Sequence, residues 1–194
     1  MKSQMKTLIQ SAVIAASLLS AGVATAEGSA SIGAATFSPQ GELQLPEGFR
    51  EWVFIGAPLT PHGLNNGNAG FPEYHHVYVN PDAFAVYERT GEFPDGTVIA
   101  KELVLLQQGD FKDGSKNAPS GRGYFAGEFR GMDVMVKDSK RFKETNAWGF
   151  FNFGHHAPPY LKTAKAAAAE SCASCHSANA GKGMVFKTYY PILR

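Results

Sequence analysis

Residues 74–105 read YHHVYVNPDAFAVYERTGEFPDGTVIAKELVL, and they hold the clearest secondary-structure signals in the chain. Residues 74–79 are rich in aromatic and β-branched side chains, which favours a strand. Asn80-Pro81-Asp82 then supplies a capping residue, a proline at the first helical position and an early acid, so we expect a short helix from there to Gly91. Residues 97–105 favour another strand.

The flanking sequence adds more strands than helices. We expect strands at 50–55 and 147–153, one bent strand or two strands at 123–137, and an extended tail or strand at 184–193. Long loops are expected at 57–73 and 108–123. The alanine-rich residues 161–173 are the best helix former. This pattern predicts an α+β fold, with a mainly antiparallel β-sheet and helices packed at one side.

Composition limits the class of protein. The chain has 194 residues, of which 44% are hydrophobic and 18% are charged, so it can form a real core and is not a disordered polymer. A net charge of +1 excludes a strongly basic nucleic-acid binder. Two cysteines exclude a disulfide-rich scaffold.

The N-terminus has the pattern of a secretory signal peptide. Lys2 and Lys6 precede an apolar run over residues 9–24, which ends in the small-x-small site Ala24-Thr25-Ala26. We expect cleavage before Glu27, a single exported domain over residues 27–194, a periplasmic location and no stable membrane anchor. The alternative is an uncleaved anchor, for which the run is short.

Residues 171–176 read SCASCH, and the Cys-x-x-Cys-His pattern is that of a covalent haem c site. Cys172 and Cys175 are spaced to add to the two vinyl groups of one haem, and His176 is then placed to ligate the iron. The alternative is a thiol–disulfide redox pair, which favours a helix start after a strand. The motif is instead expected at the end of the alanine-rich helix.

The sixth iron position has several candidates, each of which is also an ordinary core or surface residue. They are His62, His75, His76, His155, His156, Met132, Met135 and Met184. Phe150, Phe151 and Phe153 are either a wall that crowds the distal side of the haem or ordinary sheet core.

Several runs together resemble the cytochrome P-460 family over nearly all of the mature chain. The runs are REWV (50–53), EYHHVYVNP (73–81), YERTGEFPDGTV (87–98), KEL (101–103), GYF (123–125), VKD (136–138), WGFF (148–151) and MVF (184–186). The resemblance implies a mostly antiparallel β fold with helices, usually dimeric, around one c-type haem. Enzymes of this family oxidise hydroxylamine, in cases through nitric oxide, to nitrous oxide. The sister group, cytochrome c′-beta, binds diatomic gases without that turnover.

The resemblance also implies a departure at His75. The hydroxylamine oxidases of the family carry a lysine before the turn, cross-linked to the porphyrin, and the matching position here is His75. Alternation places His75 with Val77 and Val79, so we expect it at the haem. It is then a distal hydrogen-bond donor, a sixth ligand, an unusual cross-link, or simply a residue at the haem edge. Because a histidine cannot make the lysine link, we expect no lysine–haem bond.

Glu102 matches a pocket carboxylate of the family that helps to move protons. Alternation groups it with Val98, Ala100 and Val104, and a carboxylate on an apolar face is costly without a role. The alternative is that Glu102 faces water and Lys101 faces the core. We expect Glu102 to point inward.

Three function classes remain open. They are a catalytic haem protein acting on hydroxylamine or nitric oxide, a gas-binding haem protein, and a simple electron carrier. The expected partners are a small nitrogen-oxide substrate or gas, a soluble electron-transfer protein and a second copy of the chain.

The basic residues have two interpretations. Those near the end of the predicted strand at 123–137 are either a docking surface or a solvated turn: Lys137, Lys140, Arg141 and Lys143. Arg50, Arg122 and Arg130 are candidates to pair with haem propionates.

Overall fold

The computed structural model describes residues 33–109, 111–181 and 183–194. Within these ranges the fold is α+β and mostly β, with the antiparallel sheets that the sequence predicts. The elements are β1 (Leu43–Gln44), β2 (Val53–Gly56), β3 (Tyr74–Val79), α1 (Pro81–Thr90), β4 (Val98–Gln108), β5 (Tyr124–Lys137), β6 (Trp148–Asn152), β7 (Thr163–Ala164) and α2 (Cys172–Asn179), together with short 3-10 turns. The predicted signal peptide lies outside the described residues.

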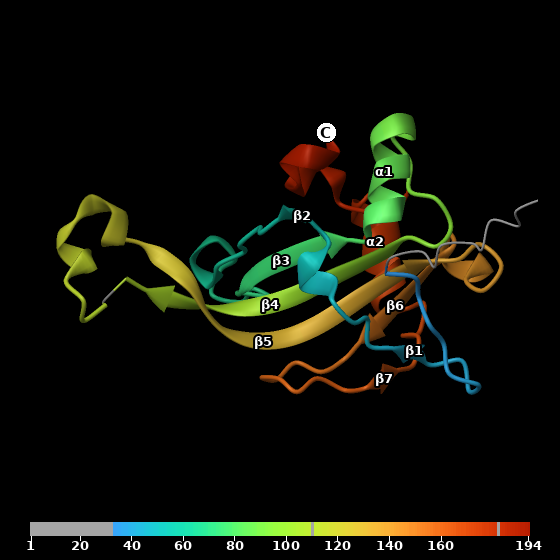
Figure 1. Cartoon of the computed structure of the whole chain (residues 1–194), viewed down its shortest axis with the longest axis horizontal. Helices are drawn as coiled ribbons and strands as arrows, with labels where there is room; N and C mark the ends of the chain where they lie inside the picture. The colour runs from blue at the N-terminus through green and yellow to red at the C-terminus, as the bar shows by residue number, and fades with distance from the viewer. Residues whose placement is uncertain (1–32, 110, 182) are drawn as a thin grey trace, which may run out of the picture.

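One five-stranded sheet organises the chain. Its strand order is β2-β3-β4-β5-β6, so each strand pairs with its neighbours in the sequence, and every pairing is antiparallel. A second, two-stranded sheet pairs β1 with β7. Figure 1 shows β4 and β5 continuing past the body of the sheet as a two-stranded arm that ends in short turns.

Both faces of the large sheet are covered. One face, here called the helix face, carries Val77, Val79 and Ile99, which pack with residues of α1, α2 and the C-terminal segment. The other, here called the β1–β7 face, carries Val98 and Ala100 and packs with the β1–β7 pair. In Figure 1 α1 and the C-terminal segment lie above the sheet, α2 overlaps the sheet in this view, and β1 and β7 lie below it. Alternate residues of a central strand therefore enter two different packed layers.

The strand and the helix predicted within residues 74–91 are confirmed. Strand β3 has the expected bounds, and α1 runs from Pro81 to Thr90 and ends at Gly91, whose φ of +73° favours glycine. Asn80 precedes the helix but its side chain does not cap it. Its amide instead accepts a hydrogen bond from the Val98 backbone N–H and donates one to the Gly96 carbonyl, which ties the helix start to β4. Residues 123–137 form one long strand with register shifts in its pairing to β4.

The predicted helix over residues 161–173 is wrong. Thr163 and Ala164 pair with β1, the Ala167 backbone N–H donates to the Phe150 carbonyl, and Ala166 bridges to Phe151. These long-range backbone bonds outweigh the helix propensity of the alanine run. The C-terminal residues 184–193 are also not a strand, because they form two 3-10 turns that cover the helix face.

Candidate haem site

The Cys-x-x-Cys-His motif occupies the first turns of α2. Cys172 and Cys175 are both exposed, free thiols, one helical turn apart. The motif therefore begins a helix, where the sequence analysis expected it to end one. A thiol–disulfide pair also favours a helix start, but the strands here are antiparallel and the motif follows no βαβ unit.

His176 is held in place by its surroundings. Its ring lies between Phe150 and Phe186, with centroids 4.7 and 4.9 Å away. Its Nδ1 lies 2.7 Å from the Met184 carbonyl, a distance at which the neutral ring donates its Nδ1–H. Burial lowers the pKa of His176, so the neutral form is favoured.

The residues of this motif fit a c-type haem. Among the described residues, Nε2 of His176 has no hydrogen-bond partner, so its lone pair is available to a metal while Nδ1–H is engaged. Histidines that ligate metals generally donate the N–H of their other ring nitrogen to a carbonyl or carboxylate, and this bond fixes the orientation of the ring. The two thiols lie free on the same short helix. The donor set therefore matches two thioether links and one axial imidazole.

His75 lies on the helix face with Val77 and Val79, as alternation predicts. Its Nε2 lies 3.2 Å from the Phe71 carbonyl, and the two rings meet edge to face at 6.0 Å. Burial and the charge of Lys101 lower the pKa of His75. His75 is therefore an enclosed, mostly neutral ring bonded to the neighbouring loop.

A row of polar residues crosses the same face. Lys101 of β4 lies opposite Asp133 of β5, which lies opposite Asn152 of β6. The Lys101 ammonium is 2.9 Å from the Asp133 carboxylate and 4.3 Å from the centre of the Phe71 ring. Its charge also contributes to the lowered pKa of His176. We call Lys101, Asp133, Asn152 and the adjoining His155 the polar row.

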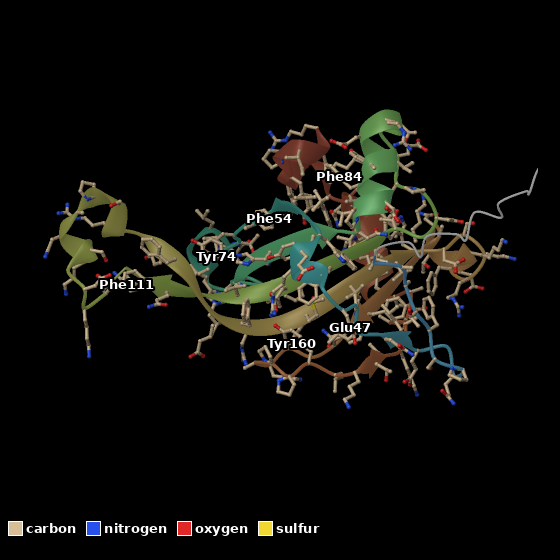
Figure 2. The ribbon with its side chains drawn as sticks, in the orientation of Figure 1. Glu47, Phe54, Tyr74, Phe84, Phe111 and Tyr160 are labelled. Carbon is tan, nitrogen blue, oxygen red and sulfur yellow. The ribbon has the colours of Figure 1, made fainter. Side chains whose placement is uncertain are left out.

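Glu102 points inward as expected, with none of its side chain exposed, but it lies on the other face of the sheet. Its carboxylate accepts hydrogen bonds from Arg50 at 2.6 and 3.0 Å and from the Tyr160 hydroxyl at 2.8 Å. Its strand neighbours Val98 and Ala100 belong to the β1–β7 core, whereas the haem motif packs on the helix face. The structure therefore does not bring Glu102 together with His75 and His176. Figure 2 shows Tyr160 below the sheet and Phe84 of α1 above it.

From alternation alone, one of Glu102 and Lys101 should face the core and the other should face solvent. The structure places neither side chain in open solvent. Because both faces are covered, alternation separates one packed layer from the other, and both side chains are largely enclosed. Arg50 is likewise occupied on the β1–β7 face, and Arg122 donates to the Lys116 and Asn117 carbonyls in the arm. Neither arginine is placed beside the haem motif.

The candidates for the sixth iron position divide between the faces. Met132 and His76 lie on the β1–β7 face, and His62 is in an exposed turn. Met184 contacts His176 through its own carbonyl. His75, His155 and Met135 are on the helix face.

Sequence reasoning missed Asp133 and the position of Lys101. A lysine in the middle of an apolar strand is a usable signal, since such a charge needs a partner. Its partner is 32 positions away and became visible only through the register of β4 and β5.

A comparison with curated proteins finds none that matches the chain. The family model Cytochrome P460 matches residues 46–187, which include β2 to β6, α2, the polar row and the Cys-x-x-Cys-His motif. The chain therefore belongs to the cytochrome P-460 family and is a haem cytochrome of that family.

Proposed function

We propose that this protein is an exported, periplasmic cytochrome with one haem c that oxidises hydroxylamine or handles nitric oxide at an open distal site. Cys172 and Cys175 would form the thioether links and His176 would be the axial ligand. The observation that carries the proposal is that the haem motif and the polar row share one face of the sheet. In the described residues no helix is long and apolar enough to span a membrane.

The chain's own residues have separable tasks at this face. The bound haem would supply the one-electron chemistry. Phe150, Phe186 and the Met184 carbonyl fix His176 in a single orientation. Lys101 places an ammonium on this face beside His75, and Asp133 balances its charge.

Lys101 also bears on the family's lysine–porphyrin link. His75 cannot make that link, but Lys101 lies on the same face, on the next strand. We propose Lys101 as the lysine that reaches the porphyrin, in place of the residue at position 75. We do not assign Glu102 a proton-carrying role at the iron, because it is paired with Arg50 on the opposite face.

The second candidate is a gas-binding cytochrome without turnover, of the cytochrome c′-beta kind. His75 favours this candidate, because its ring is bonded to the Phe71 carbonyl and encloses the site without a lysine. A simple electron carrier is less favoured, since such carriers are usually small helical folds and the described part of this chain is mostly β-sheet.

Two measurements on protein matured in the periplasm decide between the candidates. Turnover of hydroxylamine with an electron acceptor, together with a tryptic haem peptide that contains Lys101, supports the catalytic function. Nitric-oxide binding with no turnover, and haem peptides that contain only the segment with Cys172 and Cys175, supports the gas binder. Release of haem into acid acetone contradicts both.

A second copy of the chain and a soluble electron-transfer protein remain proposed partners. The basic residues 137–143 are already partly engaged within the protein. The Lys137 ammonium donates to the Phe93 carbonyl, and Arg141 pairs with Asp138. Lys140, in the turn after β5, and Lys143, at the start of the next 3-10 helix, are thus the better candidates to meet an acidic electron carrier.

A further inference from the structure

The polar row connects the helix face to the protein surface. Asp133 Oδ2 lies 2.9 Å from Lys101 Nζ, and its Oδ1 lies 3.3 Å from Nε2 of His155. About a quarter of the Lys101 and Asp133 side chains is exposed, compared with 46% of His155. The three groups therefore run in order from an enclosed ammonium to a ring open to solvent.

Asn152 holds Asp133 and His155 in this arrangement. Its side-chain oxygen accepts a hydrogen bond from the Gly154 backbone N–H, which determines the orientation of the amide. Its nitrogen then lies 2.7 Å from Asp133 Oδ1 and 2.7 Å from His155 Nε2. A neutral His155 can accept from Asn152, whereas a protonated His155 can donate to Asp133. Both protonation states of His155 thus have a partner in the same geometry.

Asp133 is suited to hold a negative charge there. Burial raises the pKa of Asp133, but the charge and hydrogen bond of Lys101 and the hydrogen bond from Asn152 outweigh burial and bring it below its usual range. Other titratable groups near this row are His75 and His176, whose pKa values are lowered by burial and by Lys101, and Glu73. The carboxylate is therefore the ordinary state of Asp133.

The aromatic ring of Phe71 organises the same groups from the loop side. It lies 4.3 Å below the Lys101 ammonium and meets the rings of His75 and His155 edge to face at 6.0 and 5.6 Å. Lys101 is thus confined between a ring and a carboxylate. Two independent contacts limit where its amine can lie.

We propose that Asp133 is a positioning residue that holds Lys101 on the haem face and, with His155, carries protons between that face and solvent. Each proton that leaves passes from a Lys101 N–H to Asp133 Oδ2. The carboxyl group then rotates to donate that proton to His155 Nε2, and the ring releases a proton from Nδ1 to water. Lys101 then regains a proton from the pocket. The path works for an ammonium and also for an amine joined to the porphyrin, because each retains an N–H.

This inference rests on the proposed function, since hydroxylamine oxidation releases protons together with electrons. The test compares Asp133→Asn, Asp133→Glu and His155→Gln in the haem-loaded protein. His156→Gln is the matched control, because its Nδ1 contacts the Ala157 carbonyl and its ring lies toward Tyr160 rather than Asp133.

The first readout is the infrared C–O stretching band of the ferrous carbonyl complex, which reports the electric field at the ligand without turnover. Asp133→Asn removes the negative charge 2.9 Å from Lys101 Nζ, so we expect the band to move. Asp133→Glu should return the band toward the wild-type position, and His156→Gln should leave it unmoved. If Asp133→Asn retains haem and its band matches wild type, the positioning role is wrong. If Asp133→Asn loses haem, Asp133→Ser, which also removes the charge, takes its place in the same comparison.

The second readout is turnover in dilute buffer. We expect Asp133→Asn to lower it on the order of 10²-fold, as for other positioned acid–base groups. His155→Gln should lower it less and should recover when a hindered base such as 1,2-dimethylimidazole is added. Unchanged turnover in both variants contradicts the proton path. A wild-type protein without any turnover contradicts the proposed function instead, and the carbonyl band still decides whether Asp133 positions Lys101.

Discussion

Glu102 and Asp133 are two carboxylates on neighbouring strands of one sheet, each paired with a cation, yet their surroundings are opposite. Glu102 is fully enclosed on the β1–β7 face, where Arg50 and Tyr160 occupy both of its oxygens from one side. Asp133 lies on the helix face and joins Lys101 to the exposed ring of His155. One carboxylate closes a core, and the other lies in a path that is open to water.

Under the proposed function, the difference separates a structural ion pair from one that carries protons. Arg50 is flanked by the rings of Phe49 and Phe129, whose centres are 5.2 and 4.4 Å away. Burial raises the pKa of Tyr160 above its ordinary value, and the hydrogen bond to Glu102 and the charge of Glu102 raise it further. Neither neighbour of Glu102 can give up a proton easily. Burial alone therefore does not identify an acid–base group, and the neighbours decide.

The largest effect should come from removing the haem attachment on the helix face. In the double variant Cys172→Ser, Cys175→Ser, no thiol remains to form a thioether, so all haem should pass into acid acetone. The matched control is Glu102→Gln, which should keep its haem with the polypeptide. Covalent haem in the double variant would show that attachment occurs elsewhere.

The next largest effect should fall on the β1–β7 face. Glu102→Ala leaves Arg50 and the Tyr160 hydroxyl without their acceptor and should lower the free energy of unfolding by about 3 kcal/mol. Asp133→Ala, whose partners reach water, should cost about 1 kcal/mol. Urea denaturation at equal haem content measures both. Equal losses would contradict the contrast between the two carboxylates.

Acid should weaken both faces through their histidines. Burial lowers the pKa values of His75 on the helix face and His76 on the β1–β7 face, with Lys101 adding to the effect at His75. The unfolded chain then takes up protons first, so stability is complete above about pH 6.5 and is lost as the pH falls below it. His75→Gln should make the loss between pH 6.5 and 5 shallower. The urea midpoint at several pH values measures this, and an unchanged slope would exclude His75 as a contributor.

The smallest expected effect is on turnover in Glu102→Gln. Because Glu102 lies on the face opposite His176, the folded, haem-loaded variant should turn over hydroxylamine at nearly the wild-type rate. The family resemblance predicted instead that this carboxylate moves protons. A large loss of turnover with intact haem would restore that assignment.

Local signals predicted the centre of the fold well. Strand β3, helix α1 and its end at Gly91 follow from side-chain type, proline position and a glycine that tolerates positive φ. The Cys172, Cys175 and His176 motif is likewise readable within six residues. By contrast, the alanine run was misassigned because its backbone pairs with β1 and β6, far away in sequence.

The candidate site was only half visible for the same reason. Alternation correctly grouped His75 with Val77 and Val79, but it could not tell which of two covered faces would hold the haem motif. That depended on where α2 packs. The contacts of Asp133 with Lys101 and His155 depend on register between strands and on a loop, which no local pattern specifies.

The adjacent charges Lys101 and Glu102 also protect the sheet from misassembly. A slip of β4 by one residue would exchange the two side chains between faces. Lys101 would then meet Arg50, and Glu102 would meet Asp133, so both layers would bury like charges together. Neighbouring apolar residues would tolerate such a slip far better. The pair thus disfavours every slip of β4 by an odd number of residues, which would enclose a repulsion in both layers.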